Sequence, residues 1–473
     1  MKKLTAIFVT LVLLMPTLAG CGSASANKAD VVIIGAGGAG LSAAVQAYEA
    51  GAKKVVILEK MPMIGGNSLR ATGGLNACGT DVQKAKNIND SVELYVKDTM
   101  EGGHNINNPE LVKTLAENSA DAVKWLTSLG ADLSDVGRGG GASVPRLHRP
   151  KGGAPVGPMI VDVLKKAVEK DNIEVRLNNK ATEILKDKDG KVTGVKAVDK
   201  EGKEYTLSAK AVVLAAGGFG ANEEMVVKYQ PSLKGFATTN QPGATGDGIV
   251  MAEKLGADFV DMKEIQTHPT VVPEKGILIT EAMRGNGAIM VNHEGKRFIN
   301  ELGTRDVLSK AVLSQNGKTA YLIFNDDVRK SLKACEEYFT QGLVKEGATI
   351  EELAKNINVD PAALKATLDT YNGYVADKND KEFNKPVEVS LSNGKYYAIE
   401  ITPAIHHTMG GVKINTKAEV IGKDGQPIKG LFAAGEVTGG VHGGNRLGGN
   451  AVADIVIFGR IAGNSAAEFI KSK

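Results

Sequence analysis

A glycine-rich turn near the start of the chain has the spacing needed to hold the phosphates of a dinucleotide. The turn follows the apolar run 31–34, precedes a stretch of good helix formers, and consists of Gly35, Gly37, Gly38, Ala39 and Gly40. Such a turn lets the backbone approach a pyrophosphate, whose negative charge is stabilised by the free N–H groups at the start of the helix. A second apolar run, 55–58, ends at Glu59, where an acid binds the ribose hydroxyls. Together these features predict a dinucleotide site.

Further segments favour FAD over NAD. Two glycine-containing segments, 65–68 and 71–74, lie just beyond Glu59, and 214–218 is similar to the strand that returns to the cofactor in flavoproteins. The segment 431–436 precedes a predicted helix whose first N–H groups would stabilise negative charge on a reduced flavin. Beyond the turn and Glu59, the residues expected to contact FAD are Asn67, Ser68, Thr72, Gly73, Ala181, Asp247, Glu436, Ala451 and Val452.

Six longer motifs carry a resemblance to a known enzyme family. They are 266–270 (QTHPT), 279–288 (ITEAMRGNGA), 295–301 (GKRFINE), 304–306 (TRD), 406–411 (HHTMGG) and 443–451 (GGNRLGGNA). On these motifs the chain, over residues 28–473, resembles the soluble fumarate reductases of the flavocytochrome c type and, more distantly, succinate dehydrogenase flavoprotein subunits. The resemblance implies an FAD-dependent oxidoreductase acting on CH–CH bonds, in which hydride from flavin N5 and a proton from an arginine convert fumarate into succinate.

The resemblance also assigns residues to the reaction. A dicarboxylate needs cations or strong donors for its carboxylates. The residues assigned to the substrate are His268, Thr280, His407, Arg446 and the backbone of Gly449. Arg305 is assigned as proton donor, and Glu281 and Arg284 as the relay that returns its proton. This role rests on the resemblance, since an arginine is ordinarily always protonated.

Some of these residues have simpler interpretations. Arg305 precedes Asp306 and could form a local ion pair, and an isolated His268 is more often a hydrogen-bonded core residue. His406 and His407 are adjacent, and neighbours on a strand point to opposite faces. We therefore expect His407 in the pocket and treat His406 as structural.

Other functions stay open at this point. A reductase of another α,β-unsaturated carboxylate, such as urocanate or methacrylate, would use the same chemistry with a different carboxylate-binding shell. A non-catalytic flavoprotein relaying electrons between envelope proteins would have no use for Glu281, Arg284 and Arg305. A 3-ketosteroid dehydrogenase fits less well, because its chemistry needs no grip on two carboxylates.

The sequence also bears on cofactors and partners. No histidine lies between Gly65 and Thr72, where covalently flavinylated relatives carry one, so the FAD is expected to be non-covalent. The chain has no Cys-x-x-Cys-His motif for a c-type haem and no cysteine cluster for a metal. We therefore expect a separate electron donor, either a cytochrome or a quinol-linked or flavin-linked protein, in a pathway of anaerobic respiration. The formal charge of +3 is not gathered into a basic stripe, which argues against a nucleic-acid partner.

The first residues are typical of a bacterial lipoprotein signal. Lys2 and Lys3 precede an uncharged apolar run, and the segment 18–21 (LAGC) resembles a lipobox. We expect residues 1–20 to be a signal peptide, Cys21 to be lipidated and 21–29 to be a tether. The protein would then lie outside the cytoplasm, held at the membrane by its lipid, or free in the periplasm if the lipobox interpretation fails.

The elements that position these residues predict an α/β protein of more than one domain. The 473 residues, 42% hydrophobic and 23% charged, exceed one ordinary domain. We expect a Rossmann-like FAD-binding domain at 28–262 and 380–473, with an inserted α+β capping domain at 263–379. The cap would carry Arg284 and Arg305 and close over the substrate, which excludes water from the hydride step.

Overall fold

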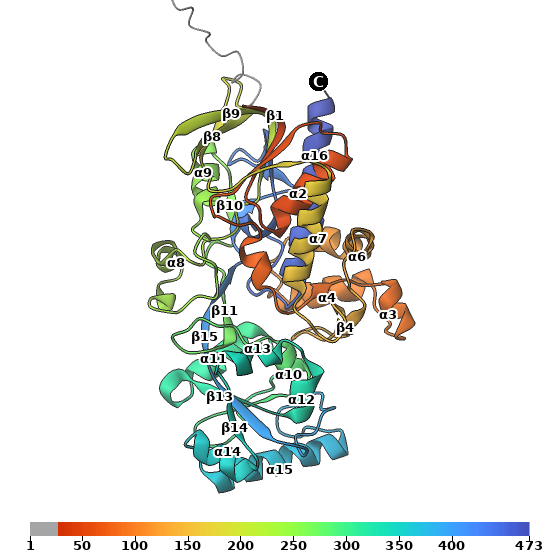
Figure 1. Ribbon diagram of the computed structural model, residues 1–473, viewed down its shortest axis with the longest axis vertical. Coiled ribbons are helices and arrows are strands. Elements are labelled where there is room, and N and C mark those ends of the chain that lie inside the picture. The colour runs from red at the N-terminus through yellow and green to blue at the C-terminus, as the bar shows by residue number, and fades with distance from the viewer. Residues whose placement is uncertain (1–26, 473) are drawn as a thin grey trace, which may run out of the picture.

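A parallel β-sheet forms the centre of one end of the molecule. The computed structural model describes residues 27–472, and Figure 1 shows this sheet near the top of an elongated shape. β1 (Lys28–Ile34) lies between β2 (Val55–Leu58) and β9 (Glu204–Leu214) and is parallel to both. The apolar residues 31–34 and 55–58 are buried, as expected for a parallel sheet covered on its faces.

The sheet brings together segments that lie far apart in the sequence. β18 (Pro427–Ala433) is parallel to β9, and β17 (Glu419–Ile421) adds an antiparallel edge. On the other side, β6 (Glu174–Arg176) is parallel to β2. A hairpin of β7 (Lys180–Lys186) and β8 (Val192–Val198) pairs with β9. Two smaller sheets contain β3 (Leu75–Asn76), β5 (Leu147–Arg149) and β4 (Asp135–Gly137), and β10 (Phe259–Val260), β16 (Gly411–Lys413) and β19 (Thr438–Gly439).

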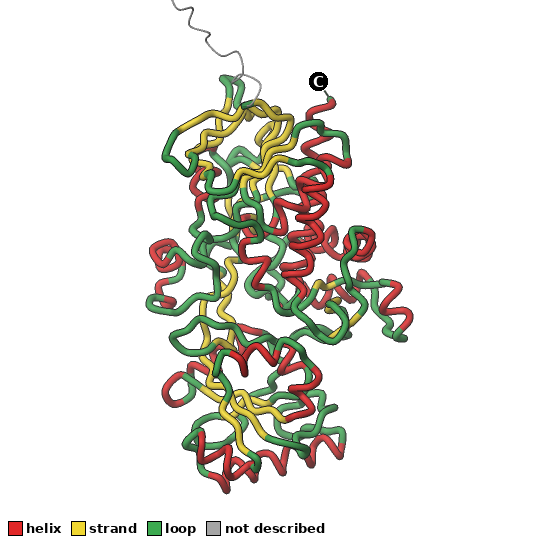
Figure 2. The backbone as a smooth tube through the Cα atoms, viewed as in Figure 1, coloured by secondary structure: helices red, strands yellow, loops and turns green. Residues whose placement is uncertain are grey.

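The helices α2 (Gly38–Glu49), α7 (Val156–Lys170) and α16 (Asn450–Lys471) lie beside this sheet (Figure 2), and α2 packs against the other two. A Cβ at Gly459 of α16 would lie 2.7 Å from the carbonyl oxygen of Ala39, so the two backbones approach closely. Because Gly459 lies nine residues into α16 and Ala39 is at the start of α2, α16 begins about 13 Å further along their common axis. The N-termini of the two helices therefore face the same side of the sheet, and that of α16 reaches further than that of α2.

The remaining helices of this half surround the sheet and the loops that follow it. They are α3 (Asp81–Ala85), α4 (Val92–Gly102), α5 (Pro109–Glu117), α6 (Ser119–Ser128), α8 (Glu223–Tyr229) and α9 (Asp247–Leu255), with the 3-10 turns η1 (Gly66–Arg70), η2 (Pro231–Leu233) and η4 (Gly435–Val437).

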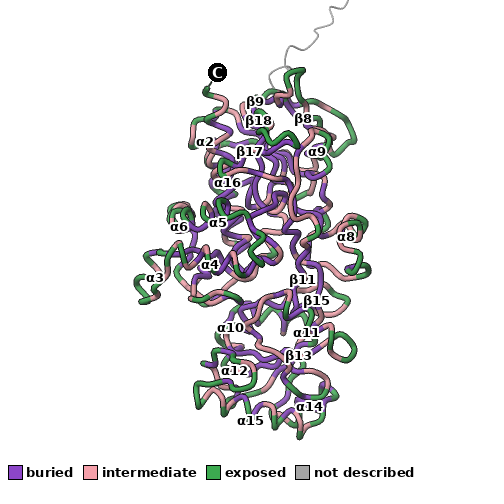
Figure 3. Tube along the Cα trace, turned by 180° about the vertical axis from the view of Figure 1, so that it is seen from behind, coloured by how far each residue is buried: buried purple, intermediate pink, exposed green. Residues whose placement is uncertain are grey.

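A second hydrophobic core, made of residues between 279 and 401, forms the cap at the other end of the molecule. Figure 3 shows buried chain in both halves. The strands of the cap sheet are β11 (Ile265–Val271), β15 (Tyr396–Thr408), β13 (Ala320–Asn325), β12 (Ile289–Val291) and β14 (Lys345–Gly347). Its helices are α10 (Ala282–Gly285), α11 (Arg305–Leu313), α12 (Asp326–Ser331), α13 (Cys335–Thr340), α14 (Ile350–Asn356) and α15 (Pro361–Asp377), with the 3-10 turn η3 (Asn316–Lys318).

The long strand β15 joins the two halves. Its first part pairs with β13 in the cap, and its last part pairs with β11 beside the FAD-binding half. The predicted end of the cap at residue 379 is too early, because Val387, Leu391 and the start of β15 pack into the cap core. Strand β15 thus carries the chain from the cap directly to the two adjacent histidines.

The predicted α/β class is confirmed. The helix expected after the segment 431–436 is present as α16. Cys78 and Cys335 are both free and buried. Among residues 27–472, no helix combines the length and the apolar character needed to cross a membrane. The predicted signal peptide, the lipidation site Cys21 and most of the tether lie outside the described residues.

Candidate active site

The predicted glycine turn lies at one end of a groove. A cavity of about 100 Å³ there is lined by Gly35, Gly37, Gly38, Ala39, Glu59, Asn67, Ser68, Ala181, Asp247 and Glu436. Gly35 has a φ of +106°, and a Cβ on it would lie 2.8 Å from the carbonyl carbon of Ala215, so only glycine fits. Gly40 does not line the cavity; a side chain there would run into the Gly35 carbonyl. It allows the close packing of helix and strand that the turn requires.

Two carboxylates fix the walls of this first cavity. Glu59 is 8% exposed, and its two oxygens accept the backbone N–H groups of Ala36 and Met61, each at 2.8 Å. Asp247 lies 2.8 Å from the ammonium of Lys60, a residue that the sequence analysis did not single out. Glu59 therefore holds the turn to the end of β2 while lining the cavity where a ribose would bind.

A second cavity, of about 140 Å³, continues the groove. It shares Asn67, Ser68, Glu436 and Ile455 with the first cavity. The predicted residues Thr72, Gly73, Gly449, Ala451 and Val452 line it. Helix α16 begins here, and no side chain caps its first turn, just as none caps the first turn of α2 in the first cavity.

The groove fits FAD. The α2 N-terminus offers N–H donors for a pyrophosphate, and the α16 N-terminus offers donors, about 13 Å further on, for negative charge on a flavin ring. A Cβ at Gly37 would meet no protein atom closer than 3.9 Å, which leaves room for phosphate against the backbone. All residues predicted to contact FAD, with the exception of Gly40, line one of the two cavities.

Two arginines meet on the far wall of the second cavity. The Nε and Nη2 atoms of Arg305 each lie 2.8 Å from Oε2 of Glu281. The Nη1 atom of Arg305 donates to Oε1 of Gln266 at 3.1 Å, and Nη2 of Arg446 donates to the same oxygen at 3.0 Å. Gln266 therefore accepts from both guanidinium groups and holds them side by side on one wall. The local ion pair between Arg305 and Asp306 does not form, because Asp306 faces His104 at 3.0 Å.

The electrostatics of this wall favour a bound anion. Burial would raise the pKa of Glu281, but the guanidinium groups of Arg305 and Arg284 outweigh it and lower that pKa to about 2. Burial lowers the pKa of Arg446 to about 9, and the charge of Arg305 acts in the same direction. At neutral pH the wall therefore carries an ionised Glu281 and a cationic Arg446. The neighbouring guanidinium of Arg305 repels that of Arg446, and a bound anion would stabilise both.

Three histidines line the same cavity: His268, His406 and His407. Burial lowers the pKa of each well below its usual value, and the nearby arginines lower it further. The rings are therefore neutral at pH 7. The N–H of Thr270 donates to Nδ1 of His268 at 3.3 Å, so His268 carries its proton on Nε2 and offers it as a donor.

The expectation that only His407 faces the pocket is wrong, because His406 lines it as well. The pairing of β15 with β11 is irregular opposite the histidines, and such an irregularity breaks the strict alternation of side chains. Nδ1 of His406 lies 2.7 Å from the hydroxyl of Thr239. Thr239 lies in a loop that no motif marked, so the sequence held no signal for this contact.

Arg284 is the one predicted catalytic residue that does not line the cavity. Its Nη2 lies 3.6 Å from Oε2 of Glu281, the oxygen that also accepts from Arg305. It lines a separate cavity of about 250 Å³ between the cap and the loop after β4. Glu281 thus stands between the two cavities. The backbone N–H of Gly140 also donates to Glu281, at 2.6 Å; the only sequence signal for this contact is the run of three glycines at 139–141.

Comparisons with known proteins agree with this geometry. Residues 30–452 match a family model described as an FAD binding domain. The chain is 53% identical to a fumarate reductase (cytochrome) of Shewanella frigidimarina over 96% of this chain and 79% of that protein, and 40% identical to a urocanate reductase of Eggerthella lenta over 93% and 74%. A solved structure of the open conformation of a flavocytochrome c3 fumarate reductase superimposes with a TM-score of 0.78 at 47% identity, covering 94% of this chain and 79% of that one. FAD is therefore the cofactor, and the chain belongs to the family of FAD-dependent oxidoreductases that contains the flavocytochrome c-type fumarate reductases.

Proposed function

We propose that this protein reduces fumarate to succinate. The observation that carries the proposal is the pair of guanidinium groups at the inner end of the groove. Arg305 and Arg446 both line the second cavity, and Gln266 holds them side by side on one wall. Two fixed guanidinium groups suit a substrate with two carboxylates, such as fumarate. Relatives named as fumarate reductases support the same substrate.

The residues around the second cavity would bind the two carboxylates. Arg446 offers charged donors, and neutral His268, His406 and His407 add N–H donors without adding charge. Thr280 and the backbone N–H of Gly449 complete the set. Holding both carboxylates fixes the alkene, and turning one of them out of the alkene plane makes the double bond more electrophilic. When bound, FAD supplies the hydride that adds to one alkene carbon.

Arg305 would supply the proton to the neighbouring carbon. It is the first residue of α11, and its guanidinium is held against the carboxylate of Glu281. Glu281 and Arg284 would return the proton from the side of the 250 Å³ cavity. Hydride and proton together convert fumarate into succinate, which balances the reaction. The cap residues Leu278 and Thr280 line the cavity, and closure of the cap over the substrate would exclude water.

The main alternative is another α,β-unsaturated carboxylate. The relative named urocanate reductase makes urocanate the first of these to test. A non-catalytic electron carrier is the weaker alternative, since such a protein would gain nothing from a buried Arg305–Glu281–Arg284 series. With reduced viologen as donor, we expect fumarate-dependent oxidation with succinate as the product. Crotonate, which has one carboxylate, should react at least about 100-fold more slowly, because one charged contact is lost. A faster reaction with urocanate or crotonate than with fumarate would contradict the proposal.

We also propose that the protein is a lipoprotein of the cell envelope that receives electrons from a separate donor. The support is the lipobox-like segment ending at Cys21 and the lack of a haem attachment motif in the sequence. In a bacterial host, the wild-type chain should take up labelled fatty acid and sediment with membranes. Cys21→Ser should abolish the labelling and release the protein. Labelling that persists in Cys21→Ser would contradict the lipobox assignment.

A further inference from the structure

The loop 138–146 connects the FAD-binding half with the proton-relay carboxylate. The N–H of Gly140 donates to Oε1 of Glu281 at 2.6 Å, while Arg305 occupies Oε2. Gly140 lies in a narrow slot: a Cβ there would be 2.9 Å from the carbonyl oxygen of Gly303 and 3.3 Å from Glu281. The loop therefore determines how the Glu281 carboxylate is turned toward Arg305.

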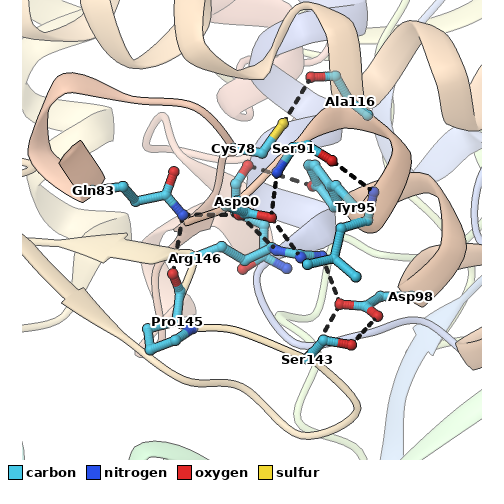
Figure 4. Close-up of polar contacts among 12 residues, drawn as sticks. Cys78, Gln83, Asp90, Ser91, Tyr95, Asp98, Ala116, Ser143, Pro145 and Arg146 are labelled. Carbon is cyan, nitrogen blue, oxygen red and sulfur yellow. Dashed lines mark hydrogen bonds and ion pairs between the residues drawn. The ribbon is translucent and has the colours of Figure 1, made fainter. Parts of the chain in front are cut away.

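A buried cluster on α4 holds this loop (Figure 4). Asp98 accepts the N–H of Ser143 at 2.8 Å and its hydroxyl at 2.5 Å. Arg146 lies 2.9 Å from Asp98 and binds Asp90 through two nitrogens, at 2.9 and 3.1 Å. The side chains of Arg146, Asp90 and Asp98 are at most 2% exposed. Ser143, which is itself exposed, and Arg146 thus tie the loop to Asp98 of α4, and Arg146 also ties it to Asp90. The two carboxylates and the guanidinium are shielded from water.

The cluster is itself anchored to the start of α16, which lines the substrate cavity. The Tyr95 hydroxyl and the Asn76 amide donate to Oδ1 of Asn450 at 3.0 and 2.7 Å. The amide of Asn76 also donates to the carbonyl of Gly448 at 2.8 Å, beside Glu281. Arg146 lies 4.8 Å from the ring centre of Tyr95. A buried ion cluster contributes little net stability but fixes a geometry, and here that geometry includes the wall of the reaction site.

We propose that Ser143 and Asp98 are positioning residues for proton delivery: they hold the loop so that Gly140 fixes the orientation of Glu281 toward Arg305. The inference rests on the proposed function, because it assigns a purpose to the relay of that reaction. Neither residue lines the substrate cavity. Loss of the Ser143 hydroxyl loosens the loop, lets the Glu281 carboxylate turn, and slows the return of the proton to Arg305, while substrate and FAD contacts stay intact.

The test compares Ser143→Ala, Ser143→Thr and the matched control Ser134→Ala in the FAD-loaded protein. Ser134 is exposed, as Ser143 is, and makes the same kind of contact, with its N–H and hydroxyl on Asp132 at 3.1 and 2.6 Å, but Asp132 is itself exposed and does not hold the 138–146 loop. Ser143→Ala should lower kcat for fumarate about 5-fold and raise the solvent deuterium isotope effect on kcat, with KM changed less than about 2-fold. Ser143→Thr keeps the hydroxyl and should restore both values, and Ser134→Ala should resemble the wild type.

Two results would overturn the inference. One is a Ser143→Ala enzyme with wild-type kcat and isotope effect. The other is a loss of kcat accompanied by loss of FAD, by a matching rise in KM, or by no recovery in Ser143→Thr, which would indicate general loosening of the structure. An inactive wild-type protein would instead contradict the proposed function, so the two failures are distinguishable.

Discussion

Replacing Arg305 with alanine should lower kcat for fumarate by about 10³–10⁴-fold while FAD stays bound. Arg305 lines the substrate cavity, is 8% exposed and is held by two contacts of 2.8 Å to Glu281. In the proposed reaction it is the only group lining the cavity among the described residues that is both protonated and connected to a path for proton return. Its loss removes the acid without touching the first cavity of the groove, whose residues lie on other elements.

The control for this prediction is Lys310→Ala. Lys310 is an exposed cation on the same helix, α11, and lines neither cavity of the groove. Turnover is measured with reduced viologen, and bound FAD by its absorbance after gel filtration. An Arg305→Ala protein that holds FAD and keeps more than about a tenth of wild-type kcat would contradict its assignment as proton donor. A protein that only relays electrons would show no fumarate turnover even in the wild type.

Replacing Arg446 with glutamine should lower kcat/KM for fumarate by about 10²–10³-fold, mainly through KM. Arg446 is 4% exposed, and its Nε atom has no partner within the described part of the chain. One of its other nitrogens is fixed by Gln266 and another by the carbonyl of Leu447. The guanidinium is therefore already oriented, and its free donor is the kind of group that a carboxylate binds strongly.

Arg446→Lys keeps the charge but loses the planar fork, so it should recover only part of the affinity. Arg460→Ala serves as the control, since Arg460 lies further along α16 and pairs with the exposed Asp121. The dissociation constant for succinate, read from the flavin spectrum, reports binding separately from chemistry. Unchanged succinate binding and an unchanged KM in Arg446→Gln would contradict its role in holding the substrate.

The parts of the fold with strong local patterns were predictable from the sequence. The glycine turn is fixed largely by contacts within the first βαβ unit, such as that of Gly40 with Gly35 and that of Glu59 with Ala36. Its sequence pattern therefore predicts it without knowledge of most of the chain. The long apolar pattern of α16 and the glycine-rich segment before it likewise predicted a helix start at the cofactor. The three residues Arg305, Glu281 and Arg446 were placed by their motifs, and the structure brings them onto one cavity wall.

The remaining features depend on contacts between distant segments. The pairing irregularity that brings His406 into the cavity arises between β11 and β15, which lie more than a hundred residues apart, so strand alternation alone gave the wrong side. The contact of Thr239 with His406 and that of Gly140 with Glu281 join loops that have no pattern of their own. The predicted end of the cap was too early because the segment between α15 and β15 has no helix or strand to mark it. Val387 and Leu391 in this segment are nevertheless buried in the cap core.

The most direct test of the central claim is a single-turnover experiment. The FAD-loaded protein is reduced with dithionite and mixed, in the absence of oxygen, with fumarate, urocanate, methacrylate or crotonate, while flavin absorbance is followed. We expect fast and selective reoxidation by fumarate, with one succinate formed per flavin. Fast reoxidation by another acrylate with fumarate inert would contradict the assigned substrate, and no reoxidation by any of the four would contradict the reductase itself.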